Sequence, residues 1–202
     1  MDQFIKKNPN PINANNNNKI IVEDETLLLI VDVQQKLLKN IKDNKLLVFN
    51  IKKLINTCNL LNIQIAITEQ NPLKLGKTLE SIIDDNEYPI FEKMEFSCIN
   101  NKNFIKYIND YNFKNIIVSG IESHICVLQT SMDLLQKGLN ILIPRDAIGS
   151  RNKMDNDTAF LRLILSGAVA STTESLICEL CKTSNRKEFR EVSKILKDSF
   201  SN

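Results

Sequence analysis

Cys126 is the residue whose type and position most clearly suggest chemistry. It follows a short apolar run, Asn115–Ile121, that is typical of a buried strand, and the residues after it repeat at helical spacing. A thiol near the start of a helix lies at the positive end of the helix dipole, which favours the thiolate, and free backbone N–H groups there can stabilise an oxyanion. The pattern favours a nucleophilic cysteine; the alternative is a buried cysteine that only packs.

A carboxylate and an ammonium group also follow expected strands. Asp32 comes directly after the apolar run Thr26–Val31, and Lys93 comes after the short run Ile90–Phe91. In an open sheet of parallel strands, ligands bind beyond the carboxyl ends of the strands, so Asp32, Lys93 and Cys126 are expected at one edge. Taken singly, Asp32 could cap a helix and Lys93 could be a solvated surface residue. Their arrival at one edge together with a thiol suggests a reactive site.

Further polar and aromatic residues follow the same strands. Six of them are candidates for a substrate pocket: Gln34, Glu69, Gln70, Phe96, Ser123 and His124. The wider set at this edge also includes Asn71, Glu95, Ser97, Glu122, Arg145, Asp146 and Ser150. For His124 the favoured interpretation is simpler, because a histidine in this position can merely pack or cap the end of a helix.

Strand-like and helix-like segments alternate along the chain and must position these residues. The expected strands are Thr26–Val31, Ile63–Thr68, Ile90–Phe91, Asn115–Ser119, Leu139–Ile143 and Ala168–Ser171. The expected helices are Lys45–Leu61, Asn103–Tyr111, Glu122–Gln136, Asn156–Ser166, Thr173–Lys182 and Lys187–Lys197, and residues 70–87 are expected to form a long loop with one short helix. This rhythm predicts an α/β protein of three layers, with a parallel sheet and helices on both faces.

Length and composition predict one domain. The chain has 202 residues, of which 43% are hydrophobic, enough for one sizeable core. Residues 1–20 are rich in Asn and are expected to be a flexible extension, which leaves residues 21–202 as the domain. The net charge is only +2 with both signs interleaved, so neither a nucleic-acid partner nor a membrane surface is expected. The N-terminus shows no secretory signal, and no apolar stretch approaches the length of a membrane span.

Cysteine and histidine counts restrict the cofactors. Five cysteines, an odd number, argue against a disulfide framework and favour a reducing, cytoplasmic setting. One His excludes a metal site built from several histidines, and no cofactor is expected. Cys178 and Cys181 form a C-x-x-C pair, but they fall within an apolar helical pattern, which favours a helix face over a redox or metal site.

Four segments of the chain carry a resemblance to a known family. They are Leu28–Gln34 (LLIVDVQ), Thr68–Pro72 (TEQNP), Glu92–Ser97 (EKMEFS) and Val118–Val127 (VSGIESHICV), with weaker likeness in segments 133–138, 146–147 and 171–174. In their order along residues 24 to 183, these segments resemble the motifs of the isochorismatase-like cysteine hydrolases. Within that family the chain is most similar to the eukaryotic isochorismatase-domain-containing group.

The resemblance implies a fold and a set of catalytic roles. It implies a Rossmann-like sheet of six parallel strands in the order 3-2-1-4-5-6, a small-molecule substrate and a homo-oligomer. It assigns Cys126 as nucleophile, Asp32 as general base, and Lys93 as the residue that holds the carboxylate and favours anionic neighbours. It also implies a cis peptide bond at Ile121–Glu122 and an oxyanion site at the N–H groups of Glu122 and Cys126.

The chain differs from two branches of this family, and each difference restricts the reaction that the resemblance implies. Nicotinamidases of this family hold a metal through an Asp-x-His-type cluster after the second strand, where this chain has Glu69-Gln-Asn-Pro72 and no His. Isochorismatases proper cleave a vinyl ether without a cysteine nucleophile, so Cys126 favours metal-independent hydrolysis of a C–N bond through a thioester. Two alternatives stay open: a non-catalytic relative that serves as an interaction module, and a thiol redox protein using Cys126 or the pair Cys178 and Cys181.

Overall fold

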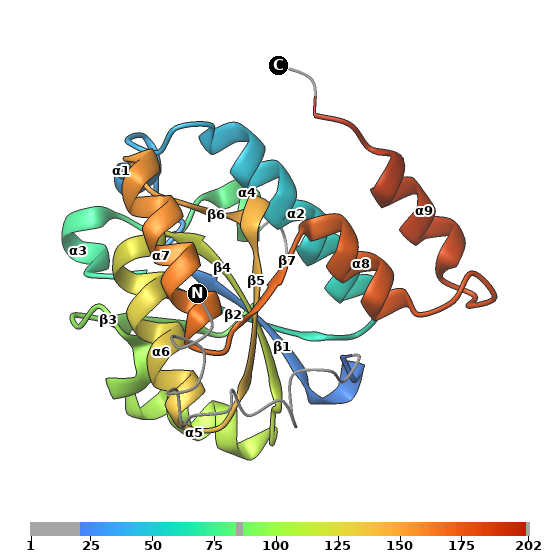
Figure 1. The fold of residues 1–202 in the computed structure, drawn as a ribbon, viewed down its shortest axis with the longest axis horizontal. Helices are drawn as coiled ribbons and strands as arrows, with labels where there is room; N and C mark the ends of the chain where they lie inside the picture. The colour runs from blue at the N-terminus through green and yellow to red at the C-terminus, as the bar shows by residue number, and fades with distance from the viewer. Residues whose placement is uncertain (1–20, 84–86, 201–202) are drawn as a thin grey trace, which may run out of the picture.

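The structure is a computed structural model that describes residues 21–83 and 87–200, and its centre is a parallel sheet (Figure 1). The strands are β1 (Thr26–Val31), β2 (Gln64–Gln70), β3 (Ile90–Lys93), β4 (Asn115–Ile121), β5 (Asn140–Pro144), β6 (Ile148–Gly149) and β7 (Val169–Ser171). Every pairing in the sheet is parallel, in the order β3-β2-β1-β4-β5-β7, with β6 paired to β4. The expected α/β class and strand order are confirmed.

The expected count of six strands is wrong by one. The additional strand is β6, which pairs Ile148 with Gly120 and Gly149 with Ile121 at the end of β4. A segment of two residues is too short to show an alternating or continuous apolar pattern, so the sequence does not reveal it. The strand expected sixth is β7, at the edge next to β5.

Buried apolar runs explain the central strands. All residues of β1 and β4 are buried, as expected of parallel strands that are covered on both faces. Alternate side chains of β1 enter two different clusters, with Leu28 and Ile30 in one and Leu27, Leu29 and Val31 in the other. The sheet therefore separates two apolar cores.

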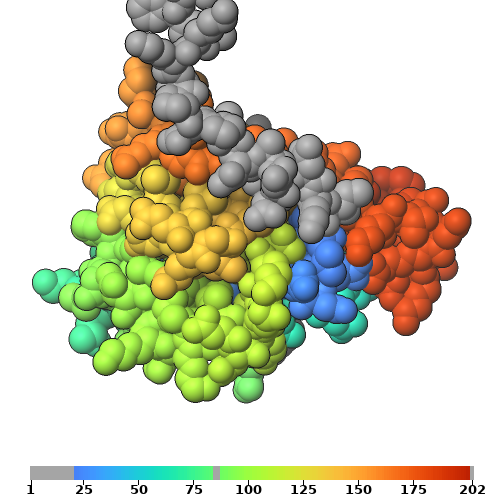
Figure 2. Space-filling view, turned by 60° about the horizontal axis from the view of Figure 1, so that its bottom comes forward, coloured from blue at the N-terminus to red at the C-terminus, as the bar shows by residue number. Residues whose placement is uncertain are grey.

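Helices cover both faces of the sheet. The bounds are α1 Gln35–Leu38, α2 Asn44–Leu60, α3 Pro72–Leu75, α4 Glu80–Ile83, α5 Lys102–Asp110, α6 Leu128–Gln136, α7 Lys153–Leu165, α8 Thr173–Cys181 and α9 Phe189–Lys197. Helices α2, α8 and α9 contribute to one core, and α5, α6 and α7 to the other (Figure 1). Figure 2 shows the C-terminal segment, coloured red, projecting at one end of the molecule. None of the helices described is long and apolar enough to cross a membrane.

Three local details differ from the expected elements. The loop expected to hold one short helix holds two, α3 and α4, in its described part. Helix α7 begins at Lys153 rather than Asn156. The helix expected over Glu122–Gln136 begins as a π-helical turn, Ser123–Val127, and becomes α-helical only at Leu128. A π turn is a local widening that often lies at functional sites, and apolar periodicity does not distinguish it from an α turn.

Gly120 allows the carboxyl end of β4 to lie very close to the end of β1, its neighbour in the centre of the sheet. Its φ is +112°, and a Cβ placed there would lie 2.1 Å from the carbonyl oxygen of Val31. Only glycine combines this conformation with this close approach. The two strand ends that precede Asp32 and Cys126 therefore lie in direct contact.

Candidate active site

Asp32 is held immediately beyond the end of β1. Its backbone has a left-handed φ of +52°, uncommon for a residue other than glycine, and its N–H donates to the carbonyl of Thr68 at 3.1 Å. The side chain is fully buried, and its Oδ1 accepts a hydrogen bond of 2.7 Å from the Thr68 hydroxyl. The end of β2 thus fixes both the backbone and the carboxylate of Asp32.

Lys93 reaches the other oxygen of the same carboxylate. Its Nζ, at the end of β3, lies 2.6 Å from Oδ2 of Asp32 and 2.9 Å from Oε1 of Gln70. Both charged side chains are shielded from solvent. A buried ion pair of this kind tolerates desolvation only when each charge keeps close partners, which Thr68 and Gln70 supply here.

Cys126 lies within the π-helical turn and is almost completely buried. Burial raises the pKa of the Cys126 thiol, the negative charge of Asp32 raises that pKa further, and the charge of Lys93 lowers it. The thiol therefore lies close enough to the Asp32–Lys93 pair for both charges to act on it. A helix N-terminus alone would lower the pKa of the thiol. Here the pKa is raised, because desolvation and the Asp32 carboxylate outweigh the effect of Lys93.

The peptide bond Ile121–Glu122, before this turn, is cis. The carboxylate of Glu122 accepts hydrogen bonds from the Arg151 side chain, from Nε at 3.2 Å and from Nη2 at 2.8 Å, and from the Arg151 backbone N–H at 3.0 Å. Its carbonyl oxygen accepts from the N–H groups of Ile125 and Val127. Glu122 therefore ties the turn to the loop that precedes α7.

Gln34 and Glu69 organise the loop around the cluster. The amide of Gln34 donates from Nε2 to the carbonyl oxygens of Gln70, at 3.1 Å, and Gly76, and its Oε1 accepts from the Gln70 N–H at 2.9 Å. Glu69 accepts a hydrogen bond of 2.6 Å from the Thr78 N–H. Both side chains are buried and bonded to backbone, so the structure gives them a supporting position rather than an open face toward a ligand.

The remaining pocket candidates lie at different depths. Gln70 accepts from Lys93 and donates from Nε2 to the carbonyl of Met94 at 2.7 Å, whereas Phe96 is about half exposed. Ser123 is fully buried, and its hydroxyl has no hydrogen-bond partner among the described residues. His124 is partly buried, with its Nδ1 2.9 Å from the Ser150 hydroxyl and its Nε2 3.9 Å from Asp155.

Two residues near the cluster were not among the site residues expected from the sequence. Thr68 orients Asp32, and its position at the end of a strand within the TEQNP motif is the signal that could have identified it. Cys98 is fully buried; burial raises its pKa to about 12, while a hydrogen bond with Thr130 and the charge of Lys93 act in the opposite direction. Nothing in the spacing of Cys98 distinguishes it from a cysteine of the core.

Arg145 and Asp146 serve other contacts. Asp146 accepts hydrogen bonds from the N–H of Thr173 at 2.8 Å and from its hydroxyl at 3.0 Å, which anchors the start of α8. Arg145 pairs with Asp157 and lies over the ring of Phe160. Within residues 21–83 and 87–200, no group of three or more His, Cys, Asp or Glu side chains is arranged to hold a metal ion.

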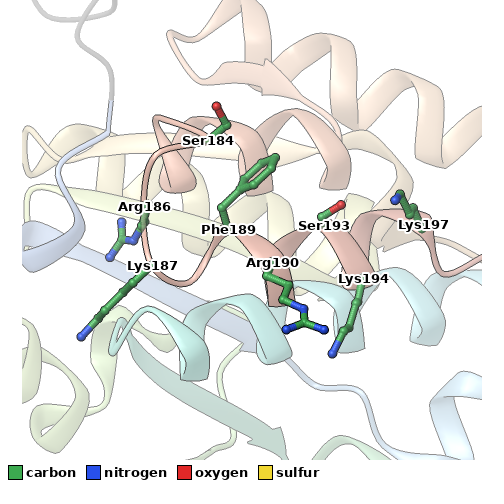
Figure 3. A pocket seen from close by; sticks show the side chains of 8 residues that line it. All are labelled: Ser184, Arg186, Lys187, Phe189, Arg190, Ser193, Lys194 and Lys197. Atoms are coloured by element: carbon green, nitrogen blue, oxygen red, sulfur yellow. The ribbon is translucent and has the colours of Figure 1, made fainter.

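A basic surface hollow beside α9 is separate from this cluster (Figure 3). Figure 3 shows Arg190 and Lys194 pointing away from Phe189 and Ser193, so the lining groups do not converge on one point. Arg186 is paired with Glu23 and Glu188, and Lys194 with Glu191. Because the lining groups diverge and several of the cations are paired with carboxylates, the hollow does not have the arrangement of a reactive site.

Known proteins share the sequence and the fold of this chain. A family model described as the isochorismatase domain matches residues 26–175. Isochorismatase family protein 1B of Dictyostelium discoideum is 36% identical over 183 residues, which cover 88% of each chain. A solved structure of MAR1 ribonuclease from Caenorhabditis elegans is 33% identical, with a TM-score of 0.85 over 91% of this chain and 95% of that chain.

More distant structures share the fold alone. YcaC from Pseudomonas aeruginosa, described with covalent acrylamide, is 21% identical with a TM-score of 0.80 over 89% of this chain and 93% of that chain. The YcaC gene product of Escherichia coli, described as an octameric hydrolase of unknown specificity, is 19% identical with a TM-score of 0.78 over 87% and 88%. The family match spans most of the parallel sheet and includes Asp32, Lys93 and Cys126. The chain therefore belongs to the isochorismatase family.

Proposed function

We propose that this protein is a metal-independent cysteine hydrolase that cleaves a small amide or similar C–N bond through a thioester on Cys126. One observation carries the proposal: a buried Asp32–Lys93 pair, with 2.6 Å between Nζ and Oδ2, whose charges act on the thiol of Cys126. An acid–base pair beside a nucleophile is the arrangement that covalent catalysis requires.

The first half-reaction forms the thioester. The sulfur of Cys126 attacks the carbonyl carbon, and the Asp32 carboxylate accepts the thiol proton as the new bond forms. Lys93 holds the carboxylate and offsets the negative charge that develops at the sulfur. Asp32 then returns the proton to the leaving nitrogen as the C–N bond breaks. The N–H groups of Glu122 and Cys126 are the proposed donors to the oxyanion.

The second half-reaction releases the acid. Water attacks the thioester carbonyl while Asp32 accepts a water proton, and the Cys126 sulfur leaves and regains a proton from Asp32. The products are a carboxylic acid and ammonia or an amine, and the enzyme returns to its starting state. No step requires a metal.

Other functions have weaker support. An interaction module that keeps the fold without catalysis would not need a desolvated ion pair beside a thiol. A thiol redox role for Cys178 and Cys181 is disfavoured because both lie on helix α8, with Cys181 buried. RNA cleavage is suggested by the names of three similar structures, which are described as MAR1 ribonuclease or putative MAR1 ribonuclease. The cations beside α9, however, do not surround Asp32 and Cys126, so the candidate site lacks a basic surface for RNA.

The test is a covalent adduct on Cys126. Purified protein is exposed to a panel of small aliphatic and aromatic amides, rapidly quenched with acid, and the mass of each cysteine-containing peptide is measured. We expect an acyl adduct on Cys126 and release of ammonia or amine, both lost in Cys126→Ala. Cys178→Ala is the matched control, because it removes the exposed cysteine and should leave turnover unchanged. Turnover that persists in Cys126→Ala would contradict the proposal.

Two properties of the whole protein complete the proposal. We propose a reducing, cytoplasmic setting, which agrees with five free cysteines in the structure. We also propose that the chain forms a homo-oligomer; the YcaC gene product of Escherichia coli, which shares the fold, is described as an octamer. We propose a small molecule as its substrate, and neither a nucleic acid nor a membrane as its partner.

A further inference from the structure

Helix α7 exposes a row of large apolar side chains. Met154, Leu161 and Leu165 are 76%, 59% and 78% exposed, although Ala159 and Leu163 on the opposite side of the same helix are buried in the core. Single exposed apolar residues are common, but a row along one helix marks an interaction surface. Figure 2 shows the segment around α7, coloured orange, at the surface of the molecule.

The spacing of this row is that of a helix-pairing seam. Met154, Thr158, Leu161 and Leu165 follow one another at intervals of four, three and four residues, and Thr158 is also exposed. Alternating steps of three and four place side chains on one stripe, as at the a and d positions of a coiled coil. The stripe extends along the whole of α7 and therefore fits another helix lying nearly parallel or antiparallel to it.

Charges beside the stripe favour an antiparallel second copy. Asp155 lies in the first turn of α7, and Arg162 lies one turn before its end. Arg162 is exposed and makes no ion pair with any residue that the structure describes. In an antiparallel pair, Asp155 of each copy flanks Arg162 of the other, whereas a parallel pair would place like charges together. A twofold axis makes both contacts at once.

We propose that α7 is the contact between two copies of this chain, packed antiparallel with Met154 of one copy facing Leu165 of the other. The proposal does not depend on the hydrolase reaction. It places the two candidate sites near one interface, because Asp155 at the start of α7 lies 3.9 Å from His124 in the turn that carries Cys126.

The first test compares the molecular mass in solution of the wild type with that of Leu161→Glu. Light scattering and sedimentation of the full chain should give a dimer or a multiple of it. Leu161→Glu places two acidic groups in the middle of the seam and should raise the dimer dissociation constant at least about 100-fold, or halve the mass of a larger assembly. Leu73→Glu is the matched control, because Leu73 is 97% exposed on α3 and lies outside the stripe. The assembly formed by this variant should have the same mass as that of the wild type.

The second test fixes the register by cross-linking. In a Cys178→Ser background, which removes the exposed native cysteine, Met154→Cys with Leu165→Cys should form a covalent dimer on mild oxidation. Met154→Cys alone should not, because the antiparallel register holds the two copies of residue 154 at opposite ends of the seam. A covalent dimer from the single variant would overturn the antiparallel register.

Three other results would overturn the proposal. The first is a wild-type monomer at micromolar concentration. The second is an assembly whose mass is unchanged by Leu161→Glu. The third is a monomer that becomes a dimer when residues 1–20 are deleted, which would assign the stripe to the chain's own N-terminal segment.

Discussion

Each oxygen of the Asp32 carboxylate has its own donor, the Thr68 hydroxyl at Oδ1 and the Lys93 ammonium at Oδ2. This arrangement holds the carboxylate in one orientation without any contact from solvent. The carboxylate is thereby fixed close enough for its charge to act on the Cys126 thiol, whose pKa is raised first by burial and then by Asp32.

Asp32→Asn separates this role from simple packing. The amide cannot accept the thiol proton, so we expect kcat/KM for a verified amide substrate to fall by a factor of about 10² to 10⁴. Lys93 would keep its charge in a buried position without its counter-ion, so the free energy of unfolding should also fall, by about 3–5 kcal/mol. Steady-state kinetics and urea unfolding measure the two effects.

Thr68→Val is the matched control for this variant. It removes only the donor to Oδ1, so the free energy of unfolding should fall by about 1–3 kcal/mol. Because Lys93 still holds Oδ2, the loss in kcat/KM should be far smaller than for Asp32→Asn. A wild-type rate in Asp32→Asn, or equal losses in the two variants, would exclude Asp32 as the proton acceptor.

At the scale of elements, the sequence predicted the strands formed by long apolar runs but not the short or irregular elements. Strands β1 and β4 are buried on both faces, so their composition alone identifies them. Strand β6 and the π turn at Ser123–Val127 depend on how β4 ends against its neighbours, which no local pattern encodes. The close approach of Gly120 to Val31 is likewise a tertiary fact.

The same distinction applies to the candidate site. Asp32, Lys93 and Cys126 were expected at one edge because the carboxyl ends of parallel strands share that edge. The supporting roles of Gln34 and Glu69 were not predictable, because their partners, Gly76 and Thr78, belong to a loop whose path the sequence does not reveal. The raised pKa of Cys126 was missed for a related reason: the helix dipole is visible in the sequence, but burial is not.

An ion pair ties the start of the described chain to the segment before α9 and gives a pH-dependent prediction. A hydrogen bond from Arg186 holds the pKa of the Glu23 carboxyl below its ordinary value. A lowered carboxyl pKa contributes stability that is present above the ordinary pKa of about 4.3 and is lost as pH falls through the lowered value. Glu23→Gln should therefore reduce the free energy of unfolding by about 1 kcal/mol at pH 7, and this difference should shrink below pH 4.

Urea unfolding at several pH values measures this difference. Glu191→Gln is the control, because Glu191 is half exposed and pairs with Lys194 one turn along the same helix, where an ion pair contributes little. A difference between wild type and Glu23→Gln that grows as pH falls would contradict the assignment.

At the scale of the whole molecule, both ends of the described chain attach to helices of one core. The N–H of Ile21 donates to Glu179 on α8 at 3.2 Å, and the Ile21 side chain is buried. Lys53 on α2 donates to the carbonyl oxygens of Leu196 and Asp198 at 3.3 and 3.1 Å. We therefore propose that residues 21–202 form one cooperative domain and that residues 1–20 are an extension of it.

Two truncations test this boundary. Removing residues 1–20 should change the free energy of unfolding by less than about 1 kcal/mol and keep a single cooperative transition, because residue 21 already begins the packed core. Removing residues 184–202 is the contrasting variant: it deletes α9, whose Val192 is fully buried against the same core, and should lower stability by several times that amount. Urea unfolding followed by circular dichroism measures both. A large loss on removing residues 1–20 would mean that the Asn-rich segment belongs to the domain, since only buried contacts can stabilise a fold to that extent.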